Sequence, residues 1–517
     1  MKKQKKNKKI SKQKIYALVL VCLSLITSLL IIKYDILPFK YMLLASIPLI
    51  VIPFLLIFLI LKKNIKKGIK SVASVISVIM IVILLFTLFY MQKTFKFLNN
   101  LIDKGYIVKN YSVIVLKESN YDKIEQLNEK TINYYINEEE KEEVIKKLDE
   151  KITCNKEETN NYDKLVTKLY DNEADAIIME ESYINIIKEN SKEFNDKTKE
   201  IYKIKIKVKI NDIAKDVNVN KDTFNVYISG IDTYGDIASV SRSDVNIVAT
   251  INPKTHQVLL TTIPRDYYVQ LDGTEGEYKD KLTHAGIYGM EKSIKTIENL
   301  LEIDINYYVK VNFSSLEKIV DALGGVDVYS EYTFVGFEGS YFTTGYNRVN
   351  GQTALEFART RKTVEGGDKT RGKNQQALIQ AILKKSCSKE IITKYTSILS
   401  SLEGSFQTNM TTDKITDIIK KQIDEMSSWN VTSISLDGSN GSELTYSYPY
   451  QELYVMIPYE DTIVNAKEKI KQVQDGEILE NSYSENDSVV NNPTKVAQQE
   501  EPQPEPKQEE LKQEEKK

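Results

Sequence analysis

Arginine is confined to one stretch of this 517-residue chain, which otherwise relies on lysine for positive charge. The six arginines are Arg242, Arg265, Arg348, Arg359, Arg361 and Arg371. A guanidinium group is planar and grips phosphate or carboxylate through two parallel hydrogen bonds, which the ammonium group of lysine cannot do. The confinement of arginine therefore indicates a site that recognises phosphate. Arg348 is the exception, because the Gly345-Tyr346-Asn347-Arg348 stretch is typical of a surface loop.

Two of these arginines are expected at the ends of neighbouring strands. Arg242 and Asp244 lie two residues apart where a strand begins, so an extended backbone puts both side chains on one side. That strand turns at Asn252-Pro253 and returns as a hairpin, which ends just before Arg265 and Asp266. Both pairs can therefore meet at one edge of a sheet.

The remaining arginines are expected near helices. Arg359 and Arg361 follow a predicted helix from Gln352 to Phe357, and they share a side only if that helix has ended and the chain is extended there. Arg371 and Gln375 are four residues apart on the first turn of another predicted helix. A helix N-terminus offers free N–H groups and the positive end of a dipole, which suits a phosphate.

The chain has only two histidines and three cysteines, so the chemistry must come from carboxylates and arginines. Cys22 lies in an apolar run, and Cys154 and Cys387 lack metal-ligand spacing; we interpret them as unlinked, with a disulfide as the alternative. Asp232 ends one strand segment and Asp244 begins another. Such carboxylates favour Mg²⁺, or Mn²⁺ in its place, over zinc. An isolated pair of carboxylates is also typical of a surface feature or a helix cap.

Three uncharged apolar runs precede this region: Ile15 to Ile32, Tyr41 to Leu61 and Ser71 to Met91. Each is long enough to cross about 30 Å of hydrocarbon as a helix. A cleaved signal peptide is the alternative for the first run, but no small-residue cleavage site follows it. Lysines are dense before the first run and after the second, whereas the loop between them carries only Lys33 and Lys40. The N-terminus is therefore expected in the cytoplasm, and everything after the third run outside the cell.

The pattern divides the chain into five parts. Residues 1–14 form a basic cytoplasmic N-terminus, and residues 15–91 form three transmembrane helices. Residues 95–212 alternate short strands and helices and are predicted to form a small α/β accessory domain, in which Ile204 to Ile210 alternates with lysine like an edge strand. Residues 220–476 are predicted to form a larger α/β domain. Residues 477–517 are rich in Gln, Glu, Pro and Lys, and we expect a disordered tail.

Several motifs in the larger domain resemble the LytR-CpsA-Psr family when taken together and in this order. They are Gly230-Ile231-Asp232, Ser241-Arg242-Ser243-Asp244, Ile263-Pro264-Arg265-Asp266, Leu323-Gly324-Gly325-Val326 and Ala358-Arg359-Thr360-Arg361, followed by Arg371 and Gln375. Each alone would be weak, but the set covers roughly Phe224 to Gly476 and is specific. The three spans and the extra outer domain look most like the capsule-type members. Asn374 is a departure, because many members carry another arginine there; Lys373 could take over that phosphate contact.

The resemblance implies a mixed-sheet extracellular domain flanked by helices, acting as a phosphotransferase. Its reaction would move a glycopolymer, such as capsular polysaccharide or teichoic acid, from a polyprenyl pyrophosphate lipid to peptidoglycan on a Gram-positive cell. Asp232 and Asp244 would hold Mg²⁺, and with Arg265, Arg359 and Arg361 they would form the catalytic set. The residues implied to grip the pyrophosphate are Arg242, Arg265, Arg359, Arg361, Arg371 and Gln375. The lipid chain would lie in an apolar tunnel between the sheet and its helices.

Arginines and a divalent cation suit this reaction on chemical grounds too, because cleaving a pyrophosphate builds charge on its oxygens. Asp232 or Asp244 would be the base for a sugar hydroxyl. Two alternatives use the same residues. One is a non-catalytic, membrane-tethered protein that binds polyprenyl pyrophosphate or glycopolymer and regulates envelope assembly. The other is a lipid pyrophosphatase, in which water replaces the sugar acceptor. A nucleic-acid role for the basic N-terminus is disfavoured by the adjoining span.

Overall fold

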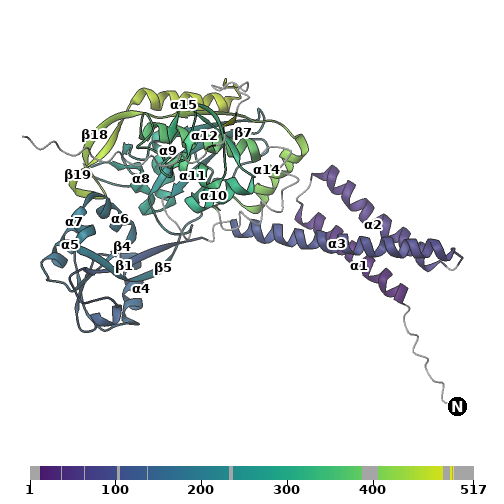
Figure 1. Cartoon of the computed structure of the whole chain (residues 1–517), viewed down its shortest axis with the longest axis horizontal. Helices are drawn as coiled ribbons and strands as arrows, with labels where there is room; N and C mark the ends of the chain where they lie inside the picture. The colour runs from purple at the N-terminus through teal and green to yellow at the C-terminus, as the bar shows by residue number, and fades with distance from the viewer. Residues whose placement is uncertain are drawn as a thin grey trace, which may run out of the picture.

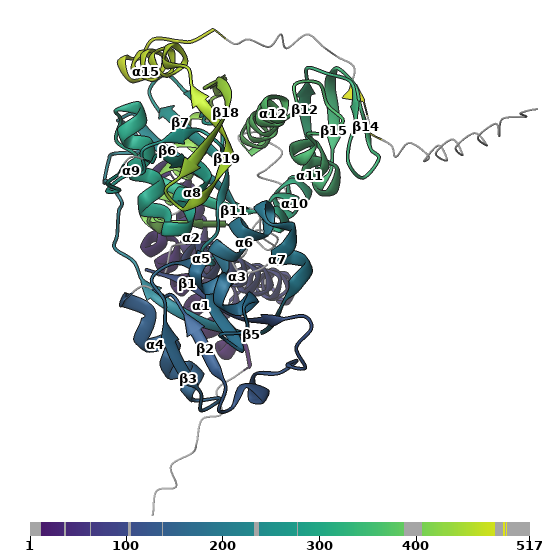
Figure 2. The same cartoon turned by 90° about the vertical axis from the view of Figure 1, so that its left-hand side faces the viewer.

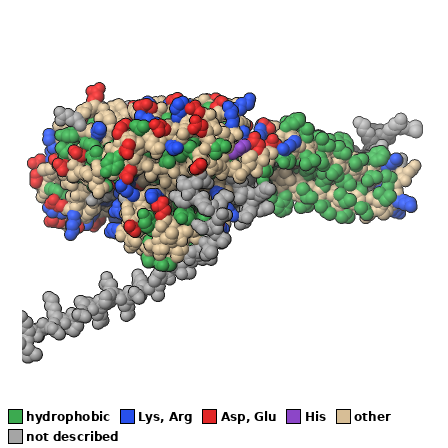
Figure 3. Space-filling view, turned by 90° about the horizontal axis from the view of Figure 1, so that it is seen from above, with side chains coloured by type: hydrophobic (Ala, Val, Ile, Leu, Met, Phe, Trp, Pro, Cys, Tyr) green, Lys and Arg blue, Asp and Glu red, His purple; other side chains and the backbone are tan. Residues whose placement is uncertain are grey.

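The computed structural model describes residues 12–35, 38–62, 64–101, 105–136, 138–231, 237–276, 278–386, 406–480, 490–491 and 493. Three long helices extend from two α/β domains that lie together at the other end of the molecule (Figure 1). Apolar side chains cover the surface of the helices, whereas charged side chains are spread over the domains (Figure 3). This contrast is expected if lipid surrounds the helices and water surrounds the domains.

The three helices are α1 (Lys12–Tyr34), α2 (Phe39–Leu61) and α3 (Lys67–Leu101). Each contains a stretch long and apolar enough to cross a membrane, which confirms the three predicted spans. Helix α3 continues ten residues beyond the predicted end of the third span, and the next described strand begins at Tyr106. The predicted start of the accessory domain at residue 95 is therefore wrong, because residues 95–101 extend the helix.

The accessory domain contains a five-stranded sheet in the order β3-β2-β4-β1-β5. Its strands are β1 (Tyr106–Leu116), β2 (Thr131–Tyr134), β3 (Asn155–Glu158), β4 (Ala176–Glu180) and β5 (Thr198–Lys209). Its helices are η1 (Ile124–Leu127), α4 (Glu138–Asp149), α5 (Tyr162–Tyr170), α6 (Glu181–Asn190) and α7 (Lys192–Lys197). Strand β5 lies at the edge, with Ile204 and Ile206 buried and Lys205 and Lys207 exposed. This confirms the predicted edge strand.

A six-stranded sheet forms the centre of the larger domain, in the order β16-β11-β6-β7-β8-β17. Its strands are β6 (Phe224–Ile231), β7 (Ser243–Asn252), β8 (Gln257–Thr262), β11 (Tyr307–Asn312), β16 (Phe406–Thr408) and β17 (Asn430–Ser435). The pairs β6–β11 and β8–β17 are parallel and the other three are antiparallel, so the sheet is mixed, as expected. Strands β7 and β8 form the predicted hairpin.

Helices cover both faces of this sheet, and others lie beside it. They are α8 (Leu282–Ala285), η2 (Gly286–Tyr288), α9 (Met290–Leu301), α10 (Phe313–Ala322), α11 (Gly351–Arg359), α12 (Asp368–Ser386), α14 (Thr412–Glu425) and α15 (Glu460–Asp475). Tyr227 and Val248 pack in one core with apolar residues of α9 and α15, whereas Val226 and Ile247 pack in another with those of α12 and α14. Successive strand residues point to opposite faces, so a sheet covered on both sides needs almost continuous apolar strands.

Smaller strands stand beside the central sheet. They are β9 (Tyr268–Val269), β10 (Asp280–Lys281), β12 (Val326–Ser330), β13 (Phe334–Val335), β14 (Tyr341–Phe342), β15 (Gly345–Val349), β18 (Gly438–Thr445), β19 (Tyr448–Pro458) and β20 (Val490–Asn491). Strands β12, β14 and β15 lie with α11 to one side of the main sheet (Figure 2). Strands β18 and β19 form a separate hairpin.

The end of the larger domain lies further along the chain than predicted. Gln257 Nε2 donates a hydrogen bond to the Glu477 carbonyl at 2.7 Å, and Asn430 Nδ2 donates to the Leu479 carbonyl at 2.8 Å. Strand β20 pairs with β15. The predicted boundary at residue 477 is therefore wrong, because residues 477–480 are bonded to the central sheet. Most of the predicted disordered tail lies outside the described residues.

The accessory domain is bonded to the larger domain through its first strand. The Val108 N–H donates to the Ala238 carbonyl, and the Val240 N–H donates to the Val108 carbonyl, both at 3.0 Å. These bonds add residues 238–240 to the sheet beside β1. Arg242 follows two residues later, so the accessory domain holds the segment that leads into the candidate site.

Candidate phosphate-binding site

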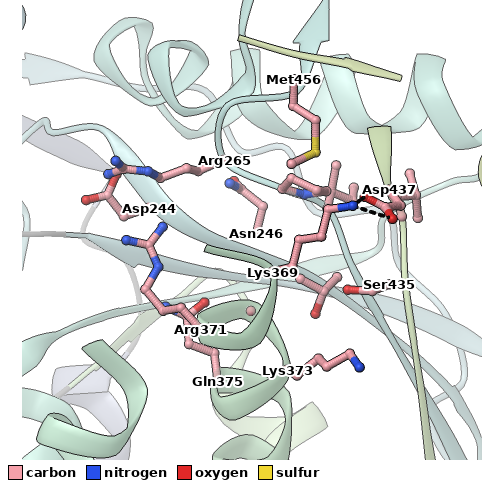
Figure 4. A pocket seen from close by; sticks show the side chains of 15 residues that line it. Asp244, Asn246, Arg265, Lys369, Arg371, Lys373, Gln375, Ser435, Asp437 and Met456 are labelled. Atoms are coloured by element: carbon pink, nitrogen blue, oxygen red, sulfur yellow. Dashed lines mark hydrogen bonds and ion pairs between the residues drawn. The ribbon is translucent and has the colours of Figure 1, made fainter. Parts of the chain in front are cut away.

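A cavity of about 230 Å³ opens where β7 begins, β8 and β17 end and α12 begins (Figure 4). Its lining residues are Asp244, Asn246, Thr262, Ile263, Pro264, Arg265, Lys369, Arg371, Gly372, Lys373, Gln375, Ser435, Leu436, Asp437 and Met456. Four of the residues predicted from the sequence, Asp244, Arg265, Arg371 and Gln375, line this one cavity. The antiparallel pairing of β7 with β8 explains why Asp244 lies near Arg265, since it puts the start of β7 beside the end of β8.

Arg265 is held in place by carboxylates on two sides. Its Nη1 lies 3.1 Å from Asp244 Oδ1, and its Nε lies 3.3 Å from Asp266 Oδ2. Thr283 Oγ1 also donates to Asp244 Oδ1 at 3.1 Å, and Lys281 Nζ lies 3.3 Å from Asp266 Oδ1. The network holds the guanidinium group in one orientation before any ligand binds. An anion that binds there therefore loses little free energy to ordering this side chain.

The start of α12 supplies the second group of cations. The helix begins at Asp368 after Gly366 and Gly367, whose φ angles of 79° and 55° are accessible at low cost only to glycine. Arg371 lies on the first turn, as predicted, and Lys369 and Lys373 flank it along the cavity wall. The positive end of the helix dipole adds to the positive potential here.

Arg242, Arg359 and Arg361 are absent from the lining of this cavity. Helix α11 ends at Arg359, two residues later than predicted, so Arg359 is helical and the condition under which it would share a side with Arg361, an extended chain at both residues, is not met. The Arg359 guanidinium lies 5.5 Å from the centre of the Phe337 ring, and Arg361 is exposed. Gln375 Nε2 donates to the Ala358 carbonyl at 3.3 Å, which ties the cavity wall to the end of α11.

Asn374 and Arg348 both face away from the cavity. Asn374 is buried and its Nδ2 donates to the Phe357 carbonyl at 3.2 Å. Lys373 lines the cavity beside it, with its Nζ 2.6 Å from Glu331 Oε2. Arg348 is paired with Asp327 at 3.0 Å and donates to the Gly324 carbonyl at 2.8 Å, which confirms its interpretation as an ordinary surface charge.

Some cavity residues were not predicted from the sequence. Lys369 forms an ion pair with Asp437 at 2.7 Å, visible at one side of Figure 4. The buried hydroxyl of Thr262 has no hydrogen-bond partner among the described residues, which favours a polar ligand in the cavity. Asn246 could have been found, because it lies two residues after Asp244 on the same strand face. Asp437 carried no local signal, because β17 reaches β8 from a distant part of the chain.

The described residues fit a weakly held Mg²⁺ better than a preformed metal cage. Asp232 lies outside the described residues, and Asp244 is the predicted ligand that the structure places. Within the described ranges, no group of three or more His, Cys, Asp or Glu side chains is arranged to hold a metal. Mg²⁺ is commonly held by one or two carboxylates, with waters and substrate phosphates in the other positions. Asp244 beside the arginines fits that pattern.

The two cysteines that we interpret as unlinked, with a disulfide as the alternative, are only partly described. Cys154 is half-buried, and burial raises the pKa of its thiol. Cys387 lies outside the described residues.

Comparison with known proteins shows which family and which relatives the chain resembles. The sequence model described as the LytR_cpsA_psr family matches residues 182–502. The polyisoprenyl-teichoic acid–peptidoglycan teichoic acid transferase TagU of Bacillus anthracis is 34% identical over 225 residues, which cover 43% of this chain and 73% of the relative. TagU of Bacillus subtilis (strain 168) is 37% identical over 206 residues, covering 40% of this chain and 66% of the relative.

Solved structures are similar to about half of the chain. The crystal structure of B. subtilis TagV has a TM-score of 0.41 and 26% identity, covering 50% of this chain and 99% of that one. The structure titled TagT bound to LI-WTA has a TM-score of 0.40 and 27% identity, covering 51% of this chain and 94% of that one.

Fold and site together define an α/β protein with a cavity lined by arginines, lysines and aspartates, and three helices able to cross a membrane. The family match spans more than half of the chain. The chain belongs to the LytR_cpsA_psr family.

Proposed function

We propose that this protein is a phosphotransferase that moves a glycopolymer from a polyprenyl pyrophosphate carrier to peptidoglycan. The convergence of Asp244, Arg265 and Arg371 with Lys369 and Lys373 in one cavity carries the proposal. Such a cluster suits a pyrophosphate, whose charge grows on its oxygens as it is cleaved. The names of the teichoic acid transferase relatives support the same reaction.

In the proposed reaction, a sugar hydroxyl of the acceptor attacks the phosphorus that carries the glycopolymer. The bond from that phosphorus to the bridging oxygen breaks, and polyprenyl phosphate leaves. Arg265 and Arg371 stabilise the charge on the phosphate oxygens, and the carboxylate of Asp244 or Asp232 accepts the hydroxyl proton. Mg²⁺ held by these two aspartates would neutralise further phosphate charge. Arg242, Arg359 and Arg361 are proposed to contact the pyrophosphate from outside the described cavity.

We propose that both α/β domains lie outside the cell. Lys40, in the first turn of α2, lies 2.6 Å from Asp424 of α14, and Lys420 of α14 pairs with Asp35 in the loop between α1 and α2. That loop and the larger domain therefore share one side of the membrane. The loop is poor in lysine compared with the N-terminus and the α2–α3 connection, which favours the outer side.

Turnover by the full-length protein in lipid nanodiscs tests the proposed function. A pyrophosphate-linked glycopolymer donor and Mg²⁺ are incubated with and without peptidoglycan fragments, and released polyprenyl phosphate is measured. Release that depends on the fragments is expected. Release at the same rate without them would indicate a lipid pyrophosphatase, and binding of the donor without release would indicate a receptor; either result would contradict the proposal.

Calorimetric titration tests the proposed metal site independently of turnover. Mg²⁺ is expected to bind the free protein weakly and more tightly in the presence of a polyprenyl pyrophosphate, whose oxygens complete its coordination. Asp244→Asn should abolish this ligand-dependent gain. Asp327→Asn, which removes the partner of Arg348 away from the cavity, serves as the control. An unchanged gain in Asp244→Asn would show that this carboxylate is structural.

A further inference from the structure

The β18–β19 hairpin and the residue that follows it expose several aromatic side chains. Among the described residues of the two α/β domains, four of the six exposed tyrosines fall between residues 446 and 459: Tyr446, Tyr450, Tyr454 and Tyr459. Single exposed apolar residues are ordinary, but a cluster on one element marks an interaction surface. No exposed large apolar residue is found in the described part of the accessory domain.

Two of these tyrosines lie on β19 itself. Tyr450, Glu452 and Tyr454 are all exposed, whereas Leu453 and Val455 on either side of Tyr454 are buried, and the pairing of β19 with β18 shifts register between Leu453 and Tyr448. We call Tyr450, Glu452 and Tyr454 the tyrosine face. The Tyr454 hydroxyl donates to Asn440 Oδ1 on β18 at 2.8 Å, so its ring is anchored at the tip.

The tyrosine face begins beside the phosphate-binding cavity. Met456, two residues after Tyr454, lines the cavity, and its N–H donates to the Asp266 carbonyl at 2.7 Å. Lys281 Nζ lies 6.0 Å from the centre of the Tyr454 ring and 3.3 Å from the carboxylate of Asp266, which in turn holds Arg265. From there the hairpin runs toward the accessory domain (Figure 1).

Charge selects the chemistry of the partner. Residues 438–458 contain two exposed carboxylates, Glu443 and Glu452, and no lysine or arginine. The cavity, in contrast, is lined by Lys369, Arg371 and Lys373. The carboxylates of the hairpin disfavour an anionic polymer along its length, and Lys281 beside Tyr454 lies at the end next to the cavity. An uncharged sugar strand is not repelled by these carboxylates.

We propose that the tyrosine face binds the uncharged sugar strand of the acceptor, a peptidoglycan glycan, and leads it to the phosphate-binding cavity; this inference rests on the proposed transfer reaction. Tyrosine rings present an apolar face on which the C–H side of a sugar ring can stack, with a polar edge that tolerates water. Glu452, between the two rings, accepts hydrogen bonds from sugar hydroxyl and amide groups.

Direct binding of a defined probe tests the inference without turnover. The probe is an uncharged β-1,4-linked tetrasaccharide of N-acetylglucosamine, titrated into the full-length protein in nanodiscs. Tyr454→Ala should weaken its binding about three- to tenfold, the range expected for losing one aromatic contact. Tyr454→Phe keeps the ring and should bind nearly as well as the wild type. Tyr341→Ala removes an equally exposed tyrosine on β14 and is the matched control.

The transfer assay adds a second readout. Tyr454→Ala should raise the KM for the glycan acceptor by a similar factor, and the KM for the lipid donor should stay at the wild-type value. Unchanged tetrasaccharide binding in Tyr454→Ala would overturn the inference. The inference would also be overturned if Tyr454→Ala weakened binding of an anionic sugar-phosphate oligomer more than binding of the tetrasaccharide. The tyrosine face would then bind the glycopolymer donor instead of the acceptor. A wild type that binds the tetrasaccharide through Tyr454 but transfers nothing would contradict the proposed function and leave the glycan-binding surface standing.

Discussion

Arg265 is the side chain whose surroundings say most about the site. It lies between Asp244 and Asp266, and only 17% of its side chain is exposed. Both carboxylates have another donor, Thr283 for Asp244 and Lys281 for Asp266. Such a network keeps a largely buried cation paired in the cavity wall, a position that suits a group stabilising charge that develops on a phosphate.

Replacing Arg265 by lysine should therefore damage catalysis even though the charge is kept. The two-sided grip is lost, and we expect kcat/KM for transfer to fall by an amount equivalent to about 2–4 kcal/mol. Arg348→Lys should be nearly silent, because exposed ion pairs contribute at most about 1 kcal/mol to stability. Equal losses in the two variants would mean that the arginines do not form one site.

Glu180 gives a pH-dependent prediction in the accessory domain. Burial raises the pKa of its carboxyl group, against the opposing effects of the Lys109 charge and the hydrogen bond from Ser182. A carboxyl whose pKa is higher in the folded state destabilises the fold as pH rises from the unfolded pKa, about 4.3, through the folded value. Glu180→Gln cannot ionise, so it should raise the melting temperature at neutral pH.

That gain should shrink on acidification and vanish below about pH 4, where the wild-type carboxyl is protonated in both states. Thermal unfolding of the full-length protein in nanodiscs, followed by circular dichroism from pH 4 to 8, measures it. The exposed Glu173→Gln is the control and should show no such trend. A pH-independent difference for Glu180→Gln would show that ionisation is not the cause.

At the scale of elements, the turn before α12 fixes the positions of Lys369 and Arg371 on the first turn of that helix. A Cβ atom at Gly366 would come within 2.6 Å of Thr370 Oγ1, on the first turn of the helix. The Thr370 hydroxyl itself donates to the Glu365 carbonyl, so the turn and the helix start are bonded together. Lys369 and Arg371 flank this threonine, and any shift of the turn moves both.

Gly366→Ala should therefore weaken binding of a polyprenyl pyrophosphate beyond its effect on stability. Its φ of 79° costs about 1–2 kcal/mol for a residue with a Cβ, and the clash displaces the helix start. Gly345 has a φ of 101°, and a Cβ atom there would meet no other atom within 4 Å. Gly345→Ala therefore introduces backbone strain without a steric clash. Affinities measured for both variants should fall only for Gly366→Ala. A matching loss in Gly345→Ala would trace the effect to general destabilisation.

At the scale of the whole molecule, the membrane helices and the two domains are tied together at two places. The loop between α1 and α2, with the start of α2, pairs with α14, and β1 of the accessory domain bonds the segment before Arg242. The accessory domain and the membrane region thus both contact the domain that carries the cavity. Surface pairs of this kind are individually weak, but together they restrict the orientation of the cavity above the bilayer.

Cysteine labelling in intact cells tests the proposed topology. In a chain with Cys154 and Cys387 replaced by alanine, an impermeant maleimide should label Glu173→Cys, which is exposed on the accessory domain. Asn64→Cys, in the connection between α2 and α3, should be labelled only after the membrane is opened. The reverse pattern would place the cavity in the cytoplasm and remove access to peptidoglycan.

The sequence by itself determined the parts of this protein that depend on local pattern. The three spans follow from uninterrupted apolar runs, the β7–β8 hairpin from its turn residues, and the N-terminal position of Arg371 from helical spacing. These features depend on neighbours a few residues apart, which the sequence displays directly.

Only the tertiary structure decided which residues share the cavity. It joined Asp437 to Lys369 through the parallel pairing of β8 with β17, left Arg359 helical at the end of α11, and turned Asn374 into the core. It also extended the larger domain to residue 480 through bonds to Gln257 and Asn430. These outcomes depend on strand pairing and packing between distant segments, for which neither residue type nor spacing carries a local signal.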